Sequence, residues 1–129
     1  MLLVLPLNPV PASRPRVARN GRVFYAKTYR NFKRQADHVV PAAILEQELE
    51  DCPLTGPLRV DLKFFAKRPK KTILQYPKPD TDNFCKAALD ALNERLFCDD
   101  EQVVQLTAEK AWAEPGQDGW IEVRVERIE

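Results

Sequence analysis

The chain has 129 residues, of which 44% are hydrophobic and 30% are charged, a length and composition typical of one globular domain. No apolar segment approaches the roughly 20 residues that a membrane-spanning helix needs. The segment from Met1 to Val10 lacks the basic region and small-residue cleavage site of a secretory signal. We therefore expect a single domain over residues 1–129 in the cytoplasm.

The cysteines argue against two kinds of stabilising site. There are three of them, Cys52, Cys85 and Cys98, and one histidine, His38. The odd number and the lack of a Cys-x-x-Cys pair exclude a simple disulfide framework and a cysteine-rich zinc site. We expect unpaired thiols, buried or half-buried, in a reducing compartment.

The net charge of +1 conceals a strong division along the chain. Residues 1–79 contain 15 Lys/Arg and 6 Asp/Glu, whereas residues 80–129 contain 5 Lys/Arg and 13 Asp/Glu. The first 36 residues contain eight basic side chains and no acidic one. This division predicts a basic surface for a polyanion and a separate acidic site.

The N-terminal half predicts one strand and one long helical segment, separated by a loop. Residues 2–7 predict the strand, and residues 8–27 predict a basic loop with a short hairpin at Asn20-Gly21. Thr28 is a candidate N-cap for a helix from Tyr29 to about Val40. We expect Pro41 to kink this helix or to begin a second piece that reaches Glu50.

The C-terminal half predicts a strand, a helix and two strands, over residues 57–66, 82–95, 101–113 and 120–128. Turn signals between the last two strands favour a hairpin. The order β-α-β-α-β-β predicts an α+β fold in two layers, with the helices packed on one face of a mixed sheet.

A group of acidic residues surrounds the second predicted helix. Asp80 and Asp82 are two residues apart and can point the same way in an extended turn. Lys86 follows Asp82 by one helical turn, so the two share a face, and Asp100 follows the helix. Mg²⁺ prefers carboxylate oxygens. If the three aspartates converge on one ion beside a lysine, they form a site for phosphodiester hydrolysis.

The spacing alone leaves a second interpretation open. Asp80, Thr81 and Asp82 at the start of a helix are also what ordinary N-capping requires. Asp99-Asp100 is equally compatible with a plain turn.

The segment PKPDTDNFCKAALDAL, followed by FCDDEQVV, resembles the signature of the RusA family of Holliday junction resolvases. The family's Asp-x-Asp-Asn-x-x-Lys core falls on residues 80–86 and its Asp-Ala-Leu motif on residues 90–92. Its Asp-Asp-x-Gln-Val motif falls on residues 99–103. The close match covers roughly residues 77–110, and length and element order are also compatible.

The resemblance implies a role for each matched residue. Asp80, Asp82 and Asp100 would bind catalytic Mg²⁺, for which Mn²⁺ is a possible substitute. Lys86 would be a catalytic electrostatic partner near the phosphate. The expected supporting residues are Asn83 for the turn, Asp90 to orient Lys86, and Asp99 beside the metal ligands.

The basic loops are candidate DNA contacts, because Lys and Arg bind phosphates without reading sequence. Solvated loops would show the same composition. Tyr25 and Tyr76 could stack on unpaired bases, whereas Tyr29 fits the core better. The nucleic-acid-binding candidates are Arg14, Arg16, Arg19, Lys27, Lys67, Lys70, Lys71 and Lys110.

These features together predict a magnesium-dependent endonuclease that resolves four-way DNA junctions by paired nicks. Because two nicks need two sites, a homodimer follows from this activity as well as from the resemblance. The alternatives are a less selective nuclease for flaps or forks, and a non-catalytic DNA-binding module whose aspartates only cap a helix.

Overall fold

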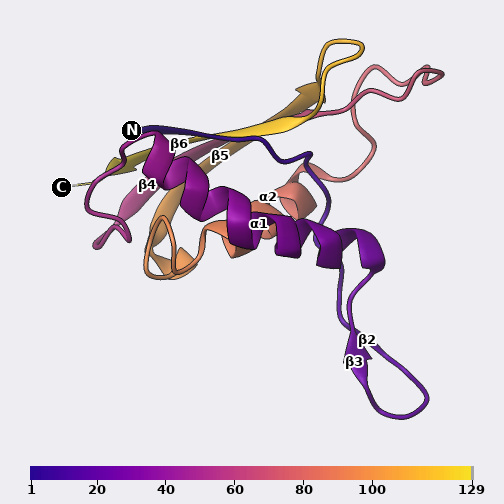
Figure 1. Ribbon diagram of the computed structural model, residues 1–129, viewed down its shortest axis with the longest axis horizontal. Helices are drawn as coiled ribbons and strands as arrows, with labels where there is room; N and C mark the ends of the chain where they lie inside the picture. Colours follow the sequence, from indigo (N-terminus) through magenta and orange to yellow (C-terminus); the bar gives the residue numbers. More distant parts are fainter. Residues whose placement is uncertain (129) are drawn as a thin grey trace.

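The computed structural model describes residues 1–128 and confirms the expected α+β fold. One layer is a four-stranded sheet in the order β1-β6-β4-β5, and two helices form the other layer (Figure 1). The elements are β1 (Leu2–Leu5), β2 (Arg16–Val17), β3 (Val23–Phe24), α1 (Lys27–Glu46), β4 (Leu58–Ala66), α2 (Thr81–Leu92), the short 3₁₀ turn η1 (Asp100–Gln102), β5 (Val103–Trp112) and β6 (Trp120–Arg127).

The core lies between one face of the sheet and the two helices. In β4 every second residue is buried, from Leu58 to Ala66, as expected for a strand with one covered face. Phe64 of this strand stacks on Phe84 of α2, with ring centroids 5.3 Å apart. This contact fixes the buried face of α2 against the middle of the sheet. The opposite face of the helix is therefore turned to solvent.

The predicted hairpin between the last two strands is wrong. β6 pairs antiparallel with both β1 and β4, whereas β5 pairs parallel with β4 at the far edge. The burial of the two strands explains this order. β6 buries Ile121, Val123 and Val125, which suits a central position, whereas β5 has no fully buried residue.

The first helix also differs from its expected form. It begins at Lys27 with Ala26 at the N-cap position, so Thr28 lies inside the first turn and does not cap it. The helix continues through Pro41 without a second start and ends at Glu46. The exposed side of α1 carries Pro41, where a lost backbone hydrogen bond can be replaced by water.

The short hairpin expected in the basic loop is confirmed. β2 and β3 pair antiparallel and project from the body of the molecule (Figure 1). The tip is closed by a backbone hydrogen bond from Ala18 N–H to the Arg22 carbonyl (2.8 Å). Gly21 provides the positive φ of 82° that the turn needs.

Two expectations about the chain as a whole can be compared with the described residues. Over residues 1–128, neither helix combines the length and the hydropathy of a membrane span. The three cysteines are unpaired; Cys85 is buried and Cys52 half-buried, but Cys98 is exposed, contrary to expectation.

Candidate active site

The first group of candidate residues lies on the exposed side of α2. Asp80 occupies the N-cap position, but its side chain makes no capping hydrogen bond. Asp80, Asp82 and Lys86 are all exposed to solvent. The capping interpretation therefore does not explain Asp80, and its carboxylate is available to a ligand. Asn83 accepts a hydrogen bond from Ala12 N–H through its backbone carbonyl (3.0 Å).

The second group lies just beyond the C-terminal end of α2. The Asp100 backbone N–H donates to Asn93 Oδ1 (3.0 Å). The Asp99 N–H donates to Gln102 Oε1 (2.8 Å), and Asp99 Oδ1 accepts from the Glu101 N–H (3.2 Å). Asp99 and Gln102 thus form a capping box for η1. These bonds hold Asp100 in place by its backbone and leave its carboxyl group exposed.

A hollow of about 340 Å³ joins this region to the root of the β2–β3 hairpin. Tyr29 at its edge donates its hydroxyl to Asp90 Oδ2 (2.7 Å). Asp90 is therefore bound by Tyr29 of α1. The resemblance had implied instead that Asp90 orients Lys86. Sequence reasoning placed Tyr29 in the core but missed this bond, because the two residues are 61 positions apart. The lining residues are Ala12, Ser13, Arg14, Pro15, Tyr25, Tyr29, Lys86, Leu89, Asp90 and Asp100.

Neighbouring carboxylates perturb the titration of Asp100. A hydrogen bond with Asp99, burial, and the negative charges of Asp99 and Asp90 raise the pKa of the Asp100 carboxyl above its ordinary value. Burial and the bond to Asp90 likewise raise the pKa of the Tyr29 hydroxyl, which keeps it a proton donor. Burial followed by the charge of Asp82 raises the pKa of the Cys85 thiol, so this thiol is not an activated nucleophile.

One chain does not bring the three candidate metal ligands together. Asp80 and Asp82 lie at the start of α2, whereas Asp100 lies beyond its end. Asp100 shares a hollow with Lys86 and Asp90, which lie about one and two helical turns beyond Asp82. Within residues 1–128, no group of three or more His, Cys, Asp or Glu side chains is placed to hold a metal ion. Asp80 and Asp82 match the one or two carboxylates that Mg²⁺ commonly takes together with water, and the role of Asp100 stays a prediction.

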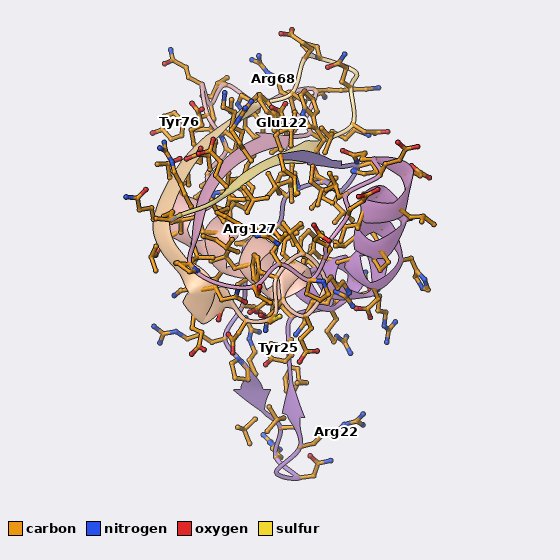
Figure 2. The ribbon with its side chains drawn as sticks, turned by 90° about the vertical axis from the view of Figure 1, so that its left-hand side faces the viewer. Arg22, Tyr25, Arg68, Tyr76, Glu122 and Arg127 are labelled. Atoms are coloured by element: carbon orange, nitrogen blue, oxygen red, sulfur yellow. The ribbon has the colours of Figure 1, made fainter. Side chains whose placement is uncertain are left out.

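The two basic segments lie at opposite ends of the molecule. Figure 2 shows Arg22 near the tip of the hairpin and Arg68 at the other end.

Three side-chain contacts hold the loop from Lys67 to Asp80 in place. Asn8 Oδ1 accepts from the Lys67 N–H (2.9 Å), Trp112 Nε1 donates to the Leu74 carbonyl (2.9 Å), and Lys110 Nζ donates to the Pro79 carbonyl (2.7 Å). Lys110 thus anchors the start of α2.

A larger and mostly apolar hollow lies elsewhere, at the C-terminal end of α1. It has a volume of about 850 Å³ and is lined by Pro41, Ile44, Leu45 and Leu49, among others. None of the candidate catalytic residues lines it, so it is separate from the chemistry described above.

Comparison with known proteins gives one family and one relative. The family model described as Endodeoxyribonuclease RusA matches residues 6–126. The chain is also similar to YqaN, an uncharacterized protein of Bacillus subtilis (strain 168), with 32% identity over 123 residues that cover 82% of this chain and 83% of the relative. The family match extends well beyond the signature segment and includes the hairpin, both helices, β4, β5 and most of β6, whereas β1 lies outside it.

Proposed function

Because the chain belongs to the RusA family of endodeoxyribonucleases, we propose that it is a magnesium-dependent endonuclease that nicks four-way DNA junctions during recombination and repair. The observation that carries the proposal is the exposed side of α2. Asp80, Asp82 and Lys86 are all exposed there, and the Asp80 side chain makes no capping bond.

We assign each candidate residue one task. Asp80, Asp82 and Asp100 hold Mg²⁺, which when bound supplies a water of lowered pKa and compensates phosphate charge. Lys86 lies one helical turn after Asp82 and lines the same hollow as Asp100. We therefore assign its ammonium group the task of stabilising the charge that develops on the scissile phosphate. Tyr29 holds Asp90 by a hydrogen bond and thereby shapes the hollow.

The basic segments hold the substrate. Arg16, Arg19 and Arg22 on the hairpin and Lys67, Lys70 and Lys71 on the opposite loop are exposed. Contacts of this kind bind phosphates regardless of sequence. Because the segments lie at opposite ends (Figure 2), they fit a branched DNA whose arms diverge from one centre.

Resolution of a four-way junction requires one nick in each of two strands. A chain with one Asp80–Asp82 pair supplies one such site, so we propose that the active form is a symmetric homodimer.

The substitution Asp82→Asn tests the catalytic assignment. It removes a ligand charge and keeps the side-chain size, so we expect cleavage of a labelled four-way junction to fall by at least about 10²-fold. Binding in a gel-shift assay without metal should persist or improve, because a charge that repels phosphate is lost. The matched control is Glu94→Gln, at an exposed position, which should cut normally. Parallel loss of binding and cleavage by Asp82→Asn would contradict the assignment.

The choice of substrate tests the junction claim separately. We expect the protein to cut a four-way junction faster than a flap, a fork or a linear duplex of the same sequence. Equal rates on all four would support the less selective nuclease instead. Cleavage of none of them with Mg²⁺ or Mn²⁺ would leave the DNA-binding module as the better account.

A further inference from the structure

The loop that joins β4 to α2 combines basic charge with an exposed apolar tip. It runs from Lys67 to Asp80, and no acidic residue precedes Asp80 in it. Ile73 is 94% exposed, more than Leu74 (41%) and Tyr76 (58%) in the same loop. Single exposed apolar residues are common on protein surfaces, so the surroundings of Ile73 decide what it can do. The basic side chains of the loop, all exposed, are Lys67, Arg68, Lys70, Lys71 and Lys78.

The tip of this β4–α2 loop is held in shape by hydrogen bonds on both sides of Ile73. The Thr72 N–H donates to the Pro69 carbonyl (3.4 Å), and Thr72 Oγ1 accepts from the Leu74 N–H (3.2 Å). From β5, Trp112 Nε1 donates to the Leu74 carbonyl (2.9 Å). The backbone next to Ile73 is therefore fixed while its side chain stays in solvent. A side chain presented in this way loses less conformational freedom when it meets a partner.

Charge and position favour DNA as the partner of Ile73. Lysines on both sides of it in the sequence bind phosphates of any sequence. An apolar tip with basic flanks also suits an anionic membrane, but the short path to the candidate site favours DNA. The Cα atoms of Ile73 and Asp80, seven residues apart, are separated by no more than about 25 Å. Lys110 also ties the loop to the start of α2, because its Nζ lies 5.5 Å from the centre of the Tyr76 ring and donates to the Pro79 carbonyl (2.7 Å).

We propose that Ile73 inserts between bases at the branch point of a four-way junction; the inference rests on the junction substrate proposed above and names a residue that selects it. Isoleucine is among the apolar side chains that proteins use as wedges to part neighbouring bases. Parting the bases of an intact duplex costs stacking free energy. At a branch point the stacking is already interrupted, so the same insertion costs less there. Ile73 therefore favours the junction over linear DNA, whereas the lysines of the loop bind both.

A fluorescent base at the branch point tests the insertion. An adenine analogue whose emission is quenched by stacking is placed beside the branch point of a four-way junction, in one arm at a time. The same analogue in the middle of a linear duplex is the control substrate. Protein is added without metal. We expect wild-type protein to raise the emission severalfold in at least one arm of the junction and hardly at all in the duplex. Ile73→Ser should leave the emission of both DNAs nearly unchanged.

Affinity measures what Ile73 contributes to the choice of substrate. In gel-shift titrations without metal, Ile73→Ser should bind the four-way junction about tenfold more weakly, because the burial of one apolar side chain is lost. It should bind the linear duplex as the wild type does. Ile73→Leu keeps an apolar side chain and should recover most of the junction affinity. The matched control Leu45→Ser changes a residue that is 79% exposed at the separate apolar hollow and should bind both DNAs normally.

Three results would overturn the inference. Equal loss of affinity for junction and duplex would make Ile73 a general contact rather than a wedge. A full rise in emission with Ile73→Ser would place another group between the bases. Unchanged DNA binding by Ile73→Ser, with weaker binding to vesicles of phosphatidylserine and phosphatidylcholine in equal amounts, would assign the tip to a lipid surface. None of these measurements needs cleavage, so a protein that cuts no DNA would refute the proposed nuclease activity and leave them valid.

Discussion

Lys86 stands between two sets of carboxylates. Asp82 lies one turn before it on α2 and Asp90 one turn after it, and Asp100 shares its hollow. We expect Lys86→Ala to lower single-turnover cleavage by about 10²-fold, by analogy with the loss of one charge-stabilising donor, and to change junction affinity far less. Lys86→Arg should recover part of the rate. Cleavage under single-turnover conditions and gel-shift titration measure the two effects, and an unchanged rate would remove Lys86 from the mechanism.

Asp99 and Asp100 form an acidic pair whose cost depends on pH. The folded state raises the pKa of Asp100. At pH values above that raised pKa, the charged Asp100 therefore lowers the free energy of unfolding. This loss of stability disappears as the pH falls and Asp100 binds a proton. Asp99→Asn removes the neighbouring charge and keeps an oxygen for the η1 cap.

We therefore expect Asp99→Asn to raise the free energy of unfolding at neutral pH in metal-free buffer. The gain should shrink as the pH falls through the raised pKa of Asp100. Urea unfolding at several pH values measures it. A gain in the free energy of unfolding that grows toward acid pH would contradict this prediction. The substitution Glu101→Gln, at an exposed position, is the control for a simple change of net charge.

Among the elements, the short turn η1 depends strongly on one side chain. Gln102 accepts from Asp99 N–H (2.8 Å) and donates to the carbonyls of Leu54 (3.0 Å) and Gly56 (2.9 Å). At about 1 kcal/mol for each net hydrogen bond, Gln102→Ala should cost about 2–4 kcal/mol in urea unfolding. Gln117→Ala, in the exposed turn before β6, should cost less than about 0.5 kcal/mol. A similar small loss for both would show that η1 is held by other contacts.

The helices and strands themselves were largely predictable, but the pairing of the strands was not. Periodicity identified both helices and the main strands, because burial repeats every 3.6 or 2 residues along the chain. The turn around Gly116 and Gly119 predicted that the chain reverses, yet it did not show that β6 inserts between β1 and β4. The informative signal was the contrast between strict alternation in β6 and its absence in β5, which marks an edge strand.

The site was predictable in composition but not in assembly. The signature named Asp80, Asp82, Lys86 and Asp100 as candidates from the sequence alone, and their roles stay a prediction. Tyr29 was out of reach, because its bond to Asp90 depends on how α1 packs on α2.

At the scale of the whole molecule, the division of charge governs encounter with DNA. The basic hairpin projects from the body (Figure 1), and Arg16, Arg19 and Arg22 are exposed on it. Each phosphate contact contributes about −0.9 to the slope of log K against log salt. Replacing all three arginines by alanine should therefore make the slope shallower by up to about 2.7 units. Arg127→Ala, on β6, should leave it unchanged. Fluorescence anisotropy at several salt concentrations measures the slope, and equal slopes would exclude the hairpin from phosphate binding.

The projecting hairpin has a final consequence for the sensitivity of the protein to proteases. β2 and β3 have two residues each and all four are exposed, so little packing holds the hairpin closed. Exposed loop tips of this kind are preferred sites of proteolytic nicking. A nick at the tip would leave the sheet and both helices intact while it loosens the arginines that we propose to hold DNA.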